Sequence, residues 1–157
     1  MARPGPSRGS DDTPPSLGPV SFVEGHAPPG RRPTPDAATV WVPPFPLSVR
    51  LSMRTLRHGG GDPCHQVTDD GLIWRTSRLA SGAVSYCLAQ QASGEVTASA
   101  WGHGADELIA SIPTLLGSQD DPDSFDPRDE RVRRAQERLR GLRMVRTGRV
   151  LESLVPA

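Results

Sequence analysis

The stretch Glu95-Val-Thr-Ala-Ser-Ala-Trp-Gly-His-Gly-Ala-Asp-Glu-Leu-Ile-Ala-Ser-Ile-Pro-Thr-Leu-Leu-Gly117 decides the fold class, because its hydrophobic period changes partway along. Up to Trp101 the residues continue a strand-like run, and after Trp101 the apolar residues recur at helical spacing. A strand that leads into an amphipathic helix is therefore predicted here. The helical stripe consists of Leu108, Ile109, Ile112, Leu115 and Leu116.

The ends of this helix carry their own signals. Asp106 and Glu107 lie in the first turn, where negative charge complements the helix dipole. Gly117 is a suitable stop, because glycine adopts the left-handed conformation that ends many helices. Pro113 lies inside the stripe and lacks a backbone donor, so we expect a kink or a break into two short helices there.

The chain before this stretch has the pattern of an antiparallel sheet. Residues 47–53 alternate apolar and polar, which predicts a half-buried strand. Glycine-containing turns then recur at short intervals and separate four further strand-like runs. The sequence thus predicts an α+β fold in which a meander of about five antiparallel strands is packed by two helices. The four later runs are residues 64–68, 72–76, 83–90 and 95–101.

A second helix is expected after the first. Asp126 can cap it, Pro127 suits its first position and Gly141 can end it. We expect its apolar residues to face the core; they are Val132, Ala135 and Leu139.

The chain divides into three parts by composition. Residues 1–38 hold nine prolines and five glycines and have almost no periodicity, so we expect a disordered tail. Residues 39–146 form the predicted sheet-and-helix domain, and residues 147–157 read as the first turns of a further helical domain. There Thr147 can cap a helix that carries Val150, Leu151, Leu154 and Val155 on one side. Because so short a helix needs a partner, we interpret the chain as truncated.

Charge is divided sharply between two neighbouring regions. Residues 106–126 carry six acids and no arginine, whereas residues 128–149 carry nine arginines and three acids. We favour a solvated helix face paired with the acidic loop before it. The alternative is a surface that contacts DNA phosphates. Its candidate residues are Arg131, Arg134, Arg138, Arg143, Arg146 and Arg149.

Other kinds of function find little support in the sequence. No run is long enough for a membrane helix, and we expect a cytoplasmic protein whose Cys64 and Cys87 are reduced thiols. The His and Cys spacing predicts no metal site, and no cofactor is implied. The loop His58-Gly-Gly-Gly61 lacks the nucleophile elbow that an esterase needs. Three tryptophans are expected in the core, with base stacking as the alternative: Trp41, Trp74 and Trp101.

Four segments, taken in order, resemble the N-terminal portion of bacterial DNA-3-methyladenine glycosylase II proteins. They are Asp62-Pro-Cys-His-Gln-Val-Thr-Asp-Asp-Gly-Leu-Ile-Trp-Arg-Thr76, Ala100-Trp-Gly-His-Gly-Ala-Asp-Glu-Leu-Ile-Ala-Ser-Ile-Pro-Thr-Leu-Leu-Gly117, Asp121-Pro-Asp-Ser-Phe125 and Gly141-Leu-Arg-Met-Val-Arg-Thr-Gly-Arg-Val-Leu-Glu-Ser-Leu-Val-Pro-Ala157.

This resemblance implies a sheet-and-helix domain like one half of a TATA-binding protein, followed in the family by a helical domain that excises alkylated purines from double-stranded DNA. The helix-hairpin-helix and the catalytic Asp of that family lie beyond the point that matches Ala157. No catalytic residue is therefore carried over, and we expect the chain to be inactive alone. The alternatives are a standalone DNA-binding module using residues 128–149, or a module that docks on a separately encoded helical catalytic domain.

Overall fold

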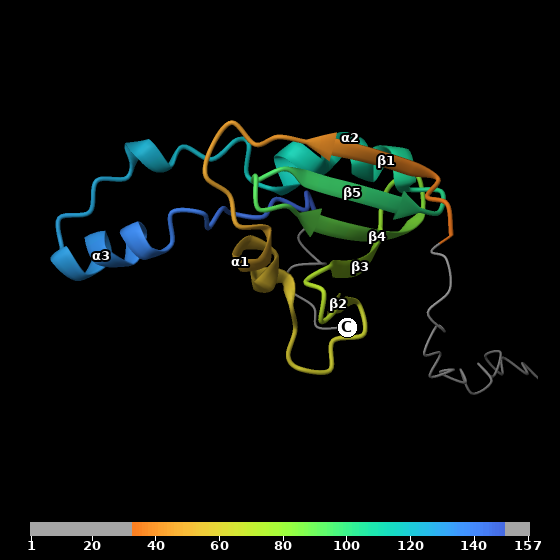
Figure 1. The fold of residues 1–157 in the computed structure, drawn as a ribbon, viewed down its shortest axis with the longest axis horizontal. Coiled ribbons are helices and arrows are strands. Elements are labelled where there is room, and N and C mark those ends of the chain that lie inside the picture. The colour runs from red at the N-terminus through yellow and green to blue at the C-terminus, as the bar shows by residue number, and fades with distance from the viewer. Residues whose placement is uncertain (1–32, 150–157) are drawn as a thin grey trace, which may run out of the picture. The chain divides into compact units, whose positions relative to one another are not determined.

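The computed structural model describes residues 33–149, apart from the side chain of residue 123. Five strands form one antiparallel sheet in the order β1-β5-β4-β3-β2 (Figure 1). Strands β2 to β5 pair consecutively as a meander, and β1, the first strand in the chain, pairs with the last strand, β5, at the edge of the sheet. The predicted α+β class with a five-stranded antiparallel sheet is confirmed. The strands are β1 (Ala37–Trp41), β2 (His65–Val67), β3 (Ile73–Arg78), β4 (Ala83–Gln90) and β5 (Val96–Trp101).

The two faces of the sheet differ because strand side chains alternate. On β4 and β5 the residues Tyr86, Leu88 and Ala98 are buried on one face. Helices α1 (Val49–Met53) and α2 (Ala105–Leu115) cover this face and complete the core with Met53 and Leu108. The opposite face has no helix on it within residues 33–149.

Helix α2 follows the prediction closely. Leu108, Ile112 and Leu115 are buried against the sheet, and Gly117 adopts φ +85° just past the helix end. The predicted break at Pro113 does not occur, since α2 runs unbroken through Pro113. Pro113 lies in the last turn of α2, so the single backbone hydrogen bond that it cannot donate is lost near the helix end and does not divide the helix.

The predicted strand at residues 47–53 is wrong. These residues lead into α1, whose N-terminus is capped by Ser48 Oγ, which accepts a hydrogen bond of 3.3 Å from the Leu51 amide. The buried positions recur at helical spacing rather than every second residue, and a 3-10 turn (Arg54–Leu56) extends the same face. They are Val49, Ser52, Met53 and Leu56.

The remaining strand is β1, which begins inside the segment assigned to the N-terminal tail. The Asp36 amide donates to Ala100 O at 2.9 Å, and Asp36 Oδ2 accepts from the Gly102 amide at 2.7 Å. The predicted boundary at residue 38 therefore falls within an edge strand, and residues 1–32 of the predicted tail lie outside the described residues.

The second predicted helix is shorter than expected and is not part of the core. Helix α3 (Glu130–Arg138) begins after Asp129 rather than at Asp126, and it ends at Arg138, with Leu139 as its C-cap, before Gly141. None of its residues is buried, so the three residues expected to face inward, Val132, Ala135 and Leu139, are exposed. Figure 1 shows α3 standing away from the sheet, joined to it by a loop that contains a 3-10 turn (Pro122–Ser124). The predicted apolar helix with Val150, Leu151, Leu154 and Val155 lies outside the described residues.

Candidate functional site

Helix α3 is stabilised mainly by contacts at its own N-terminus. Asp129 Oδ1 accepts the Arg131 amide at 2.7 Å, which makes Asp129 the N-cap. Glu130 forms ion pairs with Arg133 at 2.8 Å and Arg134 at 2.9 Å. These pairs have the (i, i+3) and (i, i+4) spacing that stabilises exposed helices, typically by a few tenths of a kcal/mol each. The helix is thus held by local interactions and offers its surface to solvent.

Three of the six predicted phosphate-binding arginines lie together. Arg131, Arg134 and Arg138 line a shallow hollow of about 450 Å³ on α3, with Ala135 and Leu139. All three arginines are exposed. This hollow therefore gathers three members of the predicted set.

Arg143, another of the predicted DNA contacts, is buried rather than exposed. It is 6% exposed, its Nε donates to Pro46 O at 3.2 Å, and its guanidinium lies over the Phe45 ring at 4.7 Å. Its amide also donates to Ser52 Oγ at 2.9 Å. A side chain with these contacts ties the segment after α3 to the start of α1, because a buried guanidinium must keep its partners.

Arg146 and Arg149 lie away from α3 and have acidic neighbours. Arg146 pairs with Asp120 at 3.4 Å, and Asp120 Oδ2 also accepts the Met144 amide at 2.7 Å. A hydrogen bond from the Ser81 hydroxyl and another from the Ser81 amide lower the pKa of Glu107, and the charge of Arg149 lowers it further. Part of the acidic region therefore does pair with the arginines that follow it.

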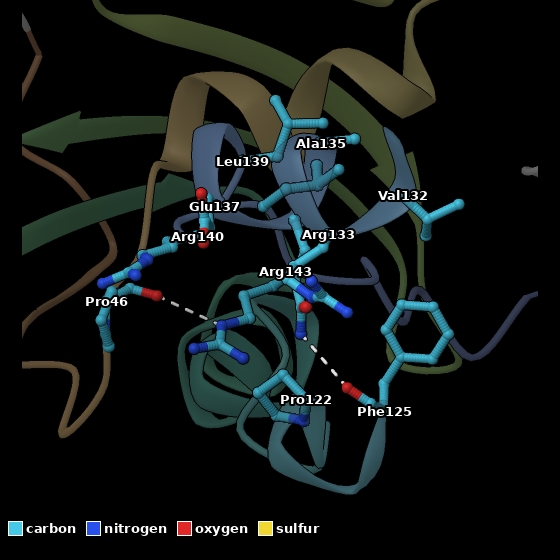
Figure 2. Close-up of a pocket in the computed structure, with 12 residues that line it drawn as sticks. Pro46, Pro122, Phe125, Val132, Arg133, Ala135, Glu137, Leu139, Arg140 and Arg143 are labelled. Atoms are coloured by element: carbon cyan, nitrogen blue, oxygen red, sulfur yellow. Dashed lines mark hydrogen bonds between the residues drawn. The ribbon is translucent and has the colours of Figure 1, made fainter. Parts of the chain in front are cut away.

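A larger groove runs along the other side of α3 (Figure 2). Its volume is about 640 Å³, and its walls come from α3, from the loop before it and from the segment around Pro46. Gln136 Nε2 donates to Phe125 O at 3.3 Å and so holds the loop to the helix. In Figure 2 the Phe125 ring lies near Val132, with Leu139 and Ala135 further along the helix. The groove is lined partly by apolar side chains and partly by polar ones, which are Arg133, Gln136, Glu137, Arg140 and Arg143.

The open face of the sheet carries two of the three tryptophans. Trp74 and Trp101 stack on each other with ring centroids 5.3 Å apart, and Trp101 Nε1 donates to the carbonyls of Pro33 and Thr34. Their expected core location is therefore wrong, whereas Trp41 does pack against the core. Since each indole already stacks on the other, one face of each ring is occupied.

A buried polar cluster near β2 was not predicted as a unit. Arg75 donates through one nitrogen to His65 Nδ1 at 3.1 Å and to Leu56 O at 2.9 Å. Burial lowers the pKa of His65, and the charge of Arg75 lowers it further. Burial raises the pKa of the nearby Asp62, but hydrogen bonds from the amides of His58 and Cys64 outweigh this, so the net pKa lies below its ordinary value. The alternation of Ile73 and Arg75 on one strand was the available signal that this arginine points inward.

Neither a metal centre nor a membrane segment is found in the part of the chain that the structure describes. There, His, Cys, Asp and Glu form no group of three or more that could hold a metal ion. No helix among residues 33–149 has the length and apolar character to cross a bilayer. Cys64 and Cys87 form no disulfide within the described residues.

Comparison with known proteins gives no assignment at this point. No family model, curated protein or solved structure matches the chain. The likeness to one half of a TATA-binding protein therefore stays a prediction from the resemblance.

Proposed function

We propose that this chain is the sheet-and-helix module of a DNA-3-methyladenine glycosylase type of protein, and that it supports a helical catalytic domain. The observation that carries the proposal is how the resembling segments fall on the fold. Residues 62–76 make the β2–β3 hairpin, and residues 100–117 span the end of β5 and all of α2. In chain order, the sequence likeness thus falls on β2 and most of β3, and then on α2 with the turn before it.

The contrast between a closed core and an exposed helix α3 favours a role in supporting another domain. The sheet, α1 and α2 close their own core, with Leu88 and Ile112 inaccessible to solvent. Helix α3 instead leaves Val132 and Leu139 exposed beside a groove. An exposed apolar face bordered by charged residues is typical of a protein interaction surface.

Reconstitution in trans tests this proposal. The chain is mixed with the separately produced helical domain of a DNA-3-methyladenine glycosylase, and release of 3-methyladenine from alkylated duplex DNA is measured. We expect no release by the chain alone and faster release by the mixture than by the helical domain alone. Release by the chain alone, or failure of the two parts to associate, contradicts the proposal.

A second candidate function is DNA binding by α3 itself. It is favoured by the clustering of Arg131, Arg134 and Arg138 around one hollow. Each phosphate contact should steepen the fall of affinity with salt, so Arg131→Gln and Arg138→Gln should each reduce the log–log salt slope by about one. Arg54→Gln is the matched control, because Arg54 is exposed and lies in the 3-10 turn after α1. Affinity for a duplex that does not change between about 50 and 200 mM salt rejects this candidate.

A further inference from the structure

Helix α3 has an apolar strip whose burial the described part of the chain does not provide. Val132, Ala135 and Leu139 are spaced three, four and seven residues apart, which places them on one side of the helix. Val132 is 42% exposed and Leu139 is 41% exposed, while Phe125 across the groove is 55% exposed. A strip at this spacing is the pattern by which one helix packs against another.

Arginines border this strip on both sides. With 3.6 residues per turn, Arg131 and Arg138 fall along one margin and Arg133 falls on the other side, where Arg140, just past the helix, also lines the groove. Glu130 is already engaged by Arg133 and Arg134, which leaves Glu137 as the acid that lines the groove. The surface around the strip is therefore strongly basic.

The groove is held open by contacts that do not involve the strip. The guanidinium of Arg143 is fixed to Pro46 O on one side, and Gln136 binds Phe125 O on the other (Figure 2). Because these contacts keep the walls in place, an occupant does not have to order them. Preorganisation of this kind favours binding.

We propose that the groove beside α3 binds an amphipathic helix whose apolar side is flanked by acidic residues. The apolar strip sets the spacing of the anchors, at i, i+3 and i+7, and the arginines on both margins select carboxylates. A second copy of α3 does not fit this description, because it would bring two arginine-bordered surfaces together. The inference rests on the proposed function for the source of the helix, which is the helical domain that this module supports.

A labelled synthetic peptide tests the surface directly. The probe is a helical peptide of about 18 residues with leucines at the anchor positions and glutamates on both flanks, titrated with the whole chain by fluorescence anisotropy. We expect binding that Val132→Gln and Leu139→Gln each weaken about tenfold, since each removes an apolar anchor. Val40→Gln is the matched control, because Val40 is 59% exposed on β1 and does not line the groove. Glutamine is a good helix former and adds no charge, so the variants keep α3 and its electrostatic field.

Several outcomes overturn the proposal. If a peptide with lysine flanks binds equally well, the groove does not select acidic residues. If the two α3 variants bind the peptide as well as the wild-type chain does, the groove is not the binding site. Displacement of the peptide by duplex DNA, with neither glutamine variant affected, assigns the surface to nucleic acid instead. If the peptide does not bind but the glycosylase helical domain still associates with the chain, the groove is not the binding site, and the proposed function stands. Peptide binding without association of the helical domain overturns the proposed function alone.

Discussion

Helices α2 and α3 are of similar length and both carry an apolar stripe, yet their environments are opposite. In α2 the stripe packs on the sheet, and Leu108 is 1% exposed. In α3 no residue is buried, and the helix is held by its N-cap and by ion pairs to Glu130. The difference teaches that helical periodicity identifies a face suited to burial but does not say what will cover it.

The largest expected difference between the two helices is in core substitutions. Leu108→Ala should lower the free energy of unfolding by about 2–5 kcal/mol, because it removes buried methyl groups and leaves a cavity. Leu139→Ala should change it by less than about 0.5 kcal/mol, since Leu139 is 41% exposed and lies outside the core cluster. Urea unfolding followed by tryptophan fluorescence measures both. A large loss for Leu139→Ala would mean that the α3 strip is covered within the chain.

Substitution of one buried and one exposed arginine compares the core region with α3 directly. Arg143→Ala should cost about 1–3 kcal/mol, because it removes the hydrogen bond to Pro46 and the contact with the Phe45 ring. Arg138→Ala should be close to neutral for stability, since this side chain is exposed on α3. Thermal unfolding of the two variants side by side measures this difference, and equal melting temperatures would refute the structural role of Arg143.

Mild acid should weaken the sheet region through His65. His65 has a pKa below its ordinary value of 6.5 in the folded chain, so below about pH 6.5 the unfolded chain binds a proton that the folded chain does not. Its contribution to stability is therefore full above pH 6.5 and is lost as the pH falls towards the folded pKa. Protonation would also remove the acceptor that Nδ1 offers to Arg75.

The test is urea unfolding between about pH 7.5 and 5, comparing the wild-type chain with His65→Gln. The wild-type chain should lose stability over this range more steeply than the variant, which has no titrating group at residue 65. Parallel curves for the two proteins would show that the buried imidazole does not titrate as inferred.

The smallest global effect is expected at the N-cap of α3. Asp129→Ala removes a cap that is typically worth about 1 kcal/mol to a helix. Because α3 buries nothing, that loss should remain local: amide exchange in α3 should quicken about fivefold while global unfolding stays within about 0.5 kcal/mol. Hydrogen exchange read by mass spectrometry separates the two. A matching drop in global stability would show that α3 unfolds together with the sheet.

The sequence predicted only part of the candidate site. The charge pattern identified the arginine-rich segment, and the structure gathers Arg131, Arg134 and Arg138 in it around one hollow. The same pattern named Arg143 as a candidate DNA contact, because sequence spacing cannot show that the carbonyl of Pro46 and the ring of Phe45 lie beside it. The pairing of His65 with Arg75 was missed for the same reason, since the contact depends on strand register.

The sequence by itself determined the features that depend on neighbouring residues. The meander from β2 to β5 follows from alternation and from turns where Gly71 and Gly94 adopt positive φ, and α2 follows from its stripe and its Gly117 stop. Only the tertiary structure decided that residues 49–53 are helical, that β1 closes the sheet beside β5 and that α3 stays outside the core. The physical reason is that burial is settled by contacts between distant segments, and an apolar pattern records that a face is suited to burial without recording its partner.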